Sequence, residues 1–162
     1  MKKSAVQKQN VGNAGEYYLA SRLSSEDFTV SITLGRAEKY DILAVNPKGK
    51  SIKISVKSRY FNDIDRFPLS YKDEKGETNN FYYAFIRLNE FKIEPDFWII
   101  PSKRVNEIIC NAEEKWLKLR NKHKRKGIRS FWLKINKTSK PLYPKNWERE
   151  LKTYYKNIAQ LE

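Results

Sequence analysis

The sequence is poor in the residues on which several common kinds of site depend. It has a single cysteine, Cys110, so no disulfide can form within the chain. Its single histidine, His123, lies in the basic run KHKRK, which argues against a zinc site and against Ser-His or Cys-His catalysis. The six glycines are scattered and form no phosphate-binding loop.

Long apolar runs are also missing. No stretch approaches the roughly 20 residues needed to cross a membrane. The start, MKKSAVQKQN, is positively charged but no apolar segment follows it, so it does not resemble a secretory signal. These absences predict a cytoplasmic protein. A chain of 162 residues that is 40% hydrophobic is expected to fold as one domain over 1–162, with a basic C-terminal part from about residue 103.

The net charge of +14 is concentrated in that C-terminal part. Residues 1–102 carry 16 Lys and Arg against 13 Asp and Glu, whereas residues 103–162 carry 17 against 6. Such an excess favours a polyanionic partner, above all nucleic acid, because each neutralised phosphate releases counterions. The alternative is a generally lysine-rich surface whose charge has no specific partner.

The hydrophobic pattern predicts an α/β fold. Helical spacing is expected over 13–24, with Asn13 as the N-cap, and over 103–121. Strands are expected over 28–34, 40–46, 51–58, 81–88, 95–100 and 130–135, and a last helix is expected from Trp147. Residues 61–80 are polar and rich in turn-forming residues, so they are expected to form a long loop over the mouth of a site.

The segment YDILAVNPKGKSIKISVKSRY, residues 40–60, predicts a β-hairpin around its Pro-Lys-Gly turn. The numbers of paired residues should sum to about 96, which places Asp41 opposite Ser55. Because side chains alternate along a strand, Ser55 and Lys57 should share the face of Asp41, with Lys53 nearer the turn. The hairpin therefore predicts a polar cluster on one side of the sheet.

Each of these residues also has a purely structural interpretation. The polar residues of the second strand can form the solvent side of an amphipathic strand, with Asp41 as the cross-strand partner of a lysine. Glu16, on the preceding helix, stands at capping-box spacing from Asn13. Taken one at a time, these residues do not decide between structure and chemistry.

In chain order, these residues resemble the PD-(D/E)XK nuclease superfamily over about residues 12–60. Glu16 in NAGEYY matches its helix Glu, Asp41 in YDILAV its Asp, and Lys57 in ISVKS its signature Lys. The resemblance implies a restriction-endonuclease-like core with a central mixed β-sheet flanked by helices. It also implies Mg²⁺- or Mn²⁺-dependent hydrolysis of DNA phosphodiester bonds, in a family whose chains commonly pair as homodimers.

The chain departs from the family at Ser55, where the signature carries an acid. The metal ligands implied are Glu16 and Asp41, with the carbonyl of Val56 and the hydroxyl of Ser55 as weaker contributors. Lys57 would stabilise charge on the phosphate or orient the attacking water. Because the missing carboxylate weakens metal binding, a catalytically inactive DNA-binding relative is the alternative. An acidic residue of the following polar loop is a further source of a replacement ligand.

The best candidates for nucleic-acid contacts follow the second long helix. They are Lys122, Lys124, Arg125, Lys126 and Arg129. Trp132 and Tyr143 are candidates for stacking on bases, although aromatic residues beside a strand more often belong to the core. A third interpretation stays open, in which the chain is an unrelated basic α/β protein that binds RNA.

Overall fold

The computed structural model describes residues 5–33, 40–60, 66–70, 79–89, 92–121 and 128–162. In chain order its elements are α1 (Ala5–Ser24), β1 (Thr29–Ile32), β2 (Ile42–Val45), β3 (Ser51–Tyr60), β4 (Arg66–Ser70), β5 (Phe81–Leu88), β6 (Asp96–Pro101), α2 (Ser102–Arg120), β7 (Ile128–Trp132), η2 (Lys140–Leu142), α3 (Trp147–Tyr154) and η3 (Ala159–Leu161). No helix within these ranges has both the length and the apolar character that crossing a membrane requires.

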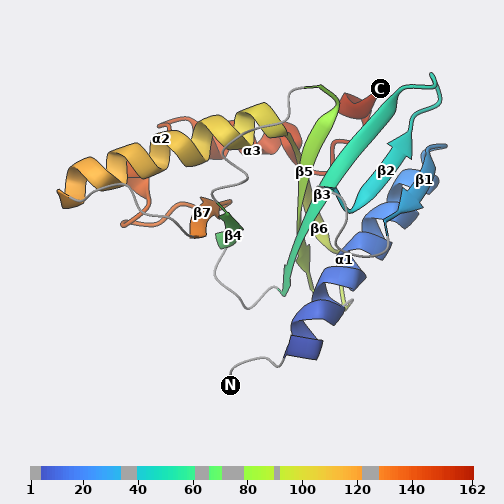
Figure 1. Ribbon diagram of the computed structural model, residues 1–162, viewed down its shortest axis with the longest axis horizontal. Coiled ribbons are helices and arrows are strands. Elements are labelled where there is room, and N and C mark those ends of the chain that lie inside the picture. The colour runs from blue at the N-terminus through green and yellow to red at the C-terminus, as the bar shows by residue number, and fades with distance from the viewer. Residues whose placement is uncertain (1–4, 34–39, 61–65, 71–78, 90–91, 122–127) are drawn as a thin grey trace.

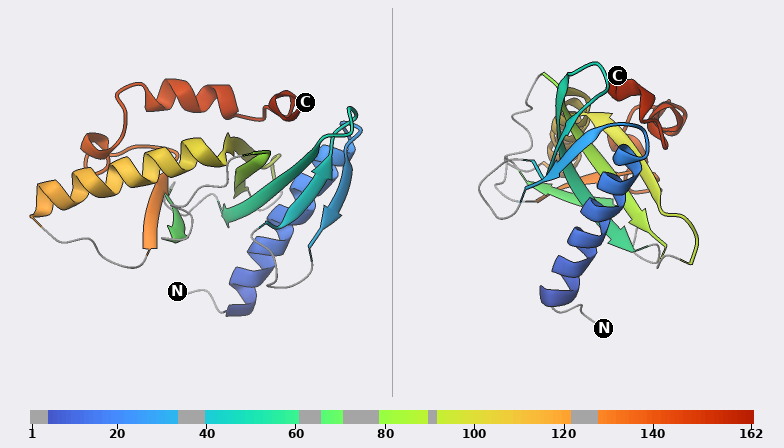
Figure 2. Two further views of the ribbon diagram at one scale, coloured as in Figure 1. Left: turned by 45° about the horizontal axis from the view of Figure 1, so that its top comes forward. Right: turned by 90° about the vertical axis from the view of Figure 1, so that its right-hand side faces the viewer.

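A five-stranded mixed sheet lies at the centre of the protein. Its strand order is β1-β2-β3-β5-β6, with β3 and β5 parallel and the other neighbouring pairs antiparallel. Helix α1 packs on one face, while α2 and a two-stranded sheet of β4 and β7 lie on the side of the other (Figures 1 and 2). The predicted central mixed sheet flanked by helices is therefore confirmed.

The hairpin of β2 and β3 has the predicted register. Ile42 pairs with Ile54, so the paired numbers sum to 96 as expected. Gly49 adopts a left-handed φ of 82° in the turn, which a residue without Cβ accepts at little cost. The side chain of Asn46 accepts the backbone N–H of Lys50 at 2.8 Å, and this bond helps to fix the turn. Local turn chemistry thus sets the pairing of both strands.

The two faces of the sheet bury different kinds of side chain. The cluster that packs against α1, here the aliphatic core, includes Leu19, Leu23, Ile42, Ala44, Ile52, Ile54, Val56, Ala84 and Ile86. The cluster that packs against α2, here the aromatic core, includes Phe67, Tyr83, Phe85, Phe131, Tyr143 and Trp147. Because side chains alternate along β5, Phe85 belongs to one core and Ile86 to the other. The rings of Phe85 and Phe131 stack with centroids 4.3 Å apart.

Helix α1 begins earlier than the sequence predicts. It starts at Ala5, so Asn13 lies in the middle of the helix and is not its N-cap. The apolar face also starts earlier, because Val11 is buried in the aliphatic core. The capping-box interpretation of Glu16 is therefore wrong, and Glu16 is a residue of the helix interior.

Strand β4 lies inside the segment expected to be a loop. It pairs antiparallel with β7, and Phe67 and Leu69 are buried on either side of Pro68. A proline between two apolar residues argues against a central strand, but an outer strand tolerates it. Strand β7 ends at Trp132, short of the predicted 130–135. The rest of the expected loop falls largely outside the described residues.

Candidate active site

Asp41 lies immediately before β2, at the point where pairing with β3 ends. Its backbone N–H donates to the carbonyl of Ile54 at 2.9 Å. Its carboxylate Oδ2 accepts the backbone N–H of Val56, two residues further along β3, at 2.6 Å. These two bonds fix both the backbone and the carboxylate of Asp41 against the part of β3 that continues to Tyr60.

A short chain of hydrogen bonds joins Lys57 to Asp41. The Lys57 ammonium donates to Ser55 Oγ at 2.9 Å, and Ser55 Oγ donates to Asp41 Oδ2 at 3.2 Å. Ser55 is only 4% exposed, so its hydroxyl bridges the two charged groups in a buried position. The structure thus brings together the three residues that the hairpin register placed on one face.

Lys53, two residues before Ser55, behaves differently. It is exposed, and its ammonium lies 5.2 Å from the centre of the Tyr40 ring. The interpretation of the polar residues as the solvent side of a strand suits Lys53. It does not suit Ser55, which is buried between a carboxylate and an ammonium.

Helix α1 is held against β3 at Gly15. A Cβ atom built on Gly15 would lie 1.7 Å from Ser58 Oγ and 2.7 Å from Ser58 Cβ, so only glycine permits this approach. Glu16 follows directly in the helix, and Ser58 follows Lys57 in β3. The contact explains why a Gly-Glu pair occurs here, since the glycine brings the glutamate to the level of Lys57.

The pKa of Glu16 is raised by its surroundings. Burial raises it above the ordinary value, the negative charge of Asp41 raises it further, and the positive charge of Lys57 partly offsets both. Glu16 therefore lies near enough to Asp41 and Lys57 to interact with both through space. Two carboxylates and one ammonium, from α1, the residue before β2 and β3, therefore interact electrostatically.

This donor set fits a single hard cation. Glu16 and Asp41 supply two carboxylates, and the described ranges contain no group of three or more His, Cys, Asp or Glu side chains suited to a metal. The N–H of Val56 points toward Asp41, and the carbonyl of the same strand residue is directed to the same edge. Mg²⁺ commonly uses one or two protein carboxylates and keeps several waters, so the residues present are sufficient.

The basic residues predicted to contact nucleic acid divide into two groups. Lys122, Lys124, Arg125 and Lys126 lie outside the described residues, so their role stays a prediction. Arg129 is 3% exposed, and its Nη1 lies 3.7 Å from Glu113 Oε1 on α2. Arg129 is therefore not part of an exposed basic surface, because β7 turns its side chain toward α2.

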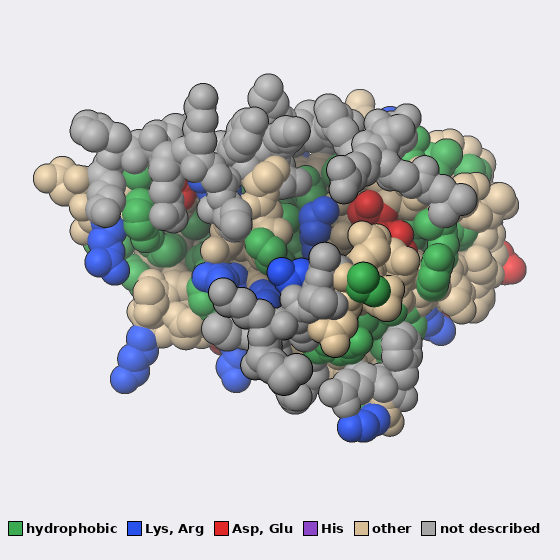
Figure 3. Space-filling model, turned by 60° about the horizontal axis from the view of Figure 1, so that its bottom comes forward, with side chains coloured by type: hydrophobic (Ala, Val, Ile, Leu, Met, Phe, Trp, Pro, Cys, Tyr) green, Lys and Arg blue, Asp and Glu red, His purple; other side chains and the backbone are tan. Residues whose placement is uncertain are grey.

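Two arginines and a tryptophan that the sequence did not place together lie beyond the lysine end of β3. Arg59 donates from its guanidinium to the backbone carbonyl of Arg66. The Arg66 guanidinium lies 5.7 Å from the centre of the Trp132 ring. Basic side chains gather on the face seen in Figure 3, with acidic side chains beside them. Arg59 continues the alternation of Ser55 and Lys57, whereas the pairing of Arg66 with Trp132 depends on contacts distant in sequence.

Comparison with known proteins gives a likeness among solved structures but none in sequence. No protein-family model matches the chain, and no curated protein matches it in sequence. Among solved structures it is similar to a bacterial homing endonuclease, I-Ssp6803I, with a TM-score of 0.46 and 16% sequence identity. The match covers 98% of this chain and 97% of that chain. A function for this chain rests on the chemistry of its own residues.

Proposed function

We propose that the protein is a divalent-metal-dependent nuclease of the PD-(D/E)XK type that hydrolyses phosphodiester bonds in DNA. The supporting observation is the hydrogen-bonded chain from Lys57 through Ser55 to Asp41. Glu16, whose pKa is shifted by the charges of both Asp41 and Lys57, is the third charged residue of the proposed site. Asp41 and Lys57, two of the residues that resemble the family in sequence order, are joined through the buried hydroxyl of Ser55, whereas the solvent side of a strand would leave that position exposed.

Each residue has a distinct role in this proposal. Glu16 and Asp41 would hold Mg²⁺ or Mn²⁺, with the carbonyl of Val56 as a further oxygen ligand. Such a cation would supply Lewis-acid chemistry toward a phosphate and a water. Lys57 supplies positive charge to the phosphate, where negative charge grows in the transition state. Ser55 holds the lysine amine beside Asp41 without adding a second negative charge.

DNA as the substrate is supported by the distribution of charge. The C-terminal part of the chain carries 17 Lys and Arg against 6 Asp and Glu. Arg59 and Arg66 extend positive charge from Lys57 toward β4 and β7. A cationic surface next to the carboxylates would hold the phosphodiester backbone while the carboxylates hold the metal.

A cleavage assay on labelled duplex DNA with Mn²⁺ or Mg²⁺ tests the proposal. The wild type should cleave, and chelation of the metal should stop cleavage. Lys57→Ala and Asp41→Asn should each lower the rate by about 10²-fold or more, the usual effect of removing a group that stabilises transition-state charge. Folding of each variant is checked by circular dichroism.

Lys53→Ala is the matched control. It removes the same charge from the same strand face, but Lys53 is exposed and lies outside the hydrogen-bonded chain. Its cleavage rate should stay close to that of the wild type. If Lys53→Ala and Lys57→Ala behave alike, the site assigned to Lys57 is wrong.

A second candidate function is favoured by Ser55. The acid of the family signature is replaced by a neutral hydroxyl, and only Glu16 and Asp41 supply carboxylates among the described residues of the site. The same chain would then be a DNA-binding protein that has lost cleavage. DNA binding without cleavage by the wild type, together with cleavage by Ser55→Asp, would favour this second function over the first.

A further inference from the structure

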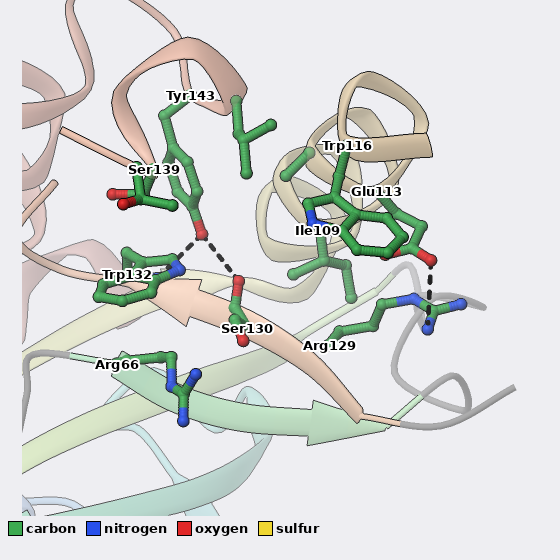
Figure 4. Close-up of a pocket in the computed structure, with 12 residues that line it drawn as sticks. Arg66, Ile109, Glu113, Trp116, Arg129, Ser130, Trp132, Ser139 and Tyr143 are labelled. Carbon is green, nitrogen blue, oxygen red and sulfur yellow. Dashed lines mark hydrogen bonds and ion pairs between the residues drawn. The ribbon is translucent and has the colours of Figure 1, made fainter. Parts of the chain in front are cut away.

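A cavity of about 200 Å³ lies between α2, β7 and the segment that follows β7 (Figure 4). Ile109 and Trp116 from α2 line one side, and Tyr143 and Trp132 line the other. Its volume is below the roughly 300–1,000 Å³ of sites for drug-sized ligands. The cavity therefore suits a ligand no larger than one planar ring system.

The aromatic wall on the far side from α2 is rigidly placed. The Tyr143 hydroxyl donates to the backbone carbonyl of Ser130 at 3.0 Å and accepts the backbone N–H of Trp132 at 2.9 Å. The indole N–H of Trp147 donates to the carbonyl of Trp132 at 2.8 Å. These bonds fix the course of β7 along the cavity, so its shape exists before any ligand enters.

A buried pair of opposite charges borders the cavity. Arg129 and Glu113 both line it, and their side chains are 2% and 10% exposed. Their Nη1 and Oε1 atoms lie 3.7 Å apart, within the range of an ion pair. A guanidinium has five N–H donors and a carboxylate has several acceptor sites, so each group can bond to a ligand in addition to its partners in the protein.

Arg66 relates the cavity to the strand of the proposed active site. Arg66 lines the cavity, and its backbone carbonyl accepts a hydrogen bond from Arg59, two residues after Lys57 in β3. The Arg66 guanidinium lies over the Trp132 ring at the cavity wall. A nucleic-acid strand whose phosphate lies at Lys57 would thus pass arginines on its way to an aromatic cavity.

We propose that this cavity takes up one unpaired base of a DNA strand, with a preference for guanine; the inference rests on the proposed function. The aromatic side chains would stack on the base, as they do in proteins that bind single strands. Guanine offers O6 as an acceptor to the guanidinium of Arg129 and two neighbouring donors, N1–H and the exocyclic amine, to the carboxylate of Glu113. Adenine offers one ring-nitrogen acceptor beside a single donor, its exocyclic amine, so it can form fewer hydrogen bonds with this pair.

Equilibrium binding without divalent metal tests the inference apart from cleavage. The probes are a short duplex with one unpaired guanine, the same duplex with one unpaired adenine, and the fully paired duplex. The wild type should bind the unpaired-guanine duplex about tenfold more tightly than the paired one, as expected for one stacked base. The unpaired-adenine duplex should bind with intermediate affinity.

Glu113→Gln and its neighbour Glu114→Gln form a matched pair of variants. Both remove one negative charge from α2, but Glu113 lines the cavity and Glu114 is exposed. Glu113→Gln should abolish the preference for guanine over adenine, whereas Glu114→Gln should keep it. If Glu113→Gln fails to fold, Trp116→Leu takes its place and should lose affinity for both unpaired duplexes but not for the paired one.

Three outcomes would overturn the inference. The first is equal affinity of the wild type for paired and unpaired duplexes. The second is identical base preference in Glu113→Gln and Glu114→Gln. The third is equally tight binding of free guanosine monophosphate, which would assign the cavity to a nucleotide instead of a DNA strand. Failure of the proposed function would appear differently, as binding of the unpaired-guanine duplex with no cleavage of any DNA when Mn²⁺ is added.

Discussion

The two faces of the central sheet are packed in contrasting ways. On the side of the aliphatic core, small and branched side chains let α1 approach β3 until Gly15 meets Ser58. On the side of the aromatic core, large flat rings support a second small sheet and leave a cavity beside α2. Close packing on one face positions the helix that carries Glu16 of the proposed site, whereas packing on the other leaves the cavity of the proposed base. The sheet between them contributes side chains to both cores, such as Ile86 to the aliphatic core and Phe85 to the aromatic core.

The largest expected effect comes from two neighbours on β5 that belong to different cores. Phe85→Ala should lower the free energy of unfolding by about 3–5 kcal/mol, because a fully buried ring is replaced by a cavity. Ile86→Val should cost only about 0.5–1.5 kcal/mol, because it removes a single methylene from the aliphatic core. Urea denaturation measures both changes.

Phe85→Leu refines this comparison by keeping part of the buried volume. Since Phe85 stacks on Phe131 in β7, its loss should also weaken binding of the unpaired-base duplex while metal binding is kept. Equal losses of stability in Phe85→Ala and Ile86→Val would mean that the aromatic core is not the more sensitive of the two.

The next effect comes from Gly15→Ala, which disturbs the close packing of the aliphatic side. The added Cβ would overlap Ser58, so α1 must move away from β3, at a cost of about 1–3 kcal/mol. DNA cleavage should fall while DNA affinity changes little, because Glu16 moves with α1. Stability and cleavage rate are measured on the same samples.

A compensating change distinguishes the contact from a general helix defect. Ser58→Gly in the Gly15→Ala background removes the atoms that the new Cβ meets and should restore part of both stability and cleavage. Gly15→Ala should otherwise favour the helix, since alanine has the higher helix propensity. A stabilised Gly15→Ala protein with normal cleavage would show that the contact does not position Glu16.

The smallest effect is the dependence of stability on pH at Glu16. Its pKa in the folded protein is raised by burial and by Asp41, so its contribution to stability is present below the unfolded pKa and is lost as pH rises through the folded pKa. Glu16→Gln removes this loss. The variant should therefore become more stable than the wild type as pH rises, when no divalent metal is present.

Mn²⁺ should reverse that order. A cation that binds the folded wild type stabilises it by mass action and favours the ionised form of Glu16, whereas the glutamine variant gains less. The measurement is chemical denaturation at several pH values with and without Mn²⁺. A stability difference between the two proteins that stays constant with pH would contradict the burial of Glu16 and its interaction with Asp41.

Much of the sheet could be predicted from the sequence because its rules are local. The bounds of β5 follow from the apolar run 81–88, and the pairing of Ile42 with Ile54 follows from the length of the turn. The meeting of Asp41 with Ser55 and Lys57 then follows from strand alternation. These features need no knowledge of which segments distant in sequence pack together.

The features that the sequence did not predict depend on distant contacts. Strand β4 forms because Phe67 pairs with Phe131 of β7, which lies far along the chain, and both rings are buried in the aromatic core. In the sequence, Arg129 belongs to a basic run and is expected to be exposed. In the structure it is buried, because β7 directs its side chain toward Glu113. The cavity likewise arises only when α2 and β7 lie together, although Trp132 and Tyr143 could be singled out from the sequence as aromatic candidates.

The contact at Gly15 also links chemistry to the motions of one helix. Glu16 interacts electrostatically with Asp41 only while α1 is docked, and a local opening of α1 would leave β3, Arg66 and the cavity in place. If the protein has the proposed function, it would then exchange between a form that can cut DNA and a form that can only hold it. The amide hydrogens of α1 would exchange with solvent at a rate set by that opening, so their protection factor gives the fraction of time in which α1 is docked.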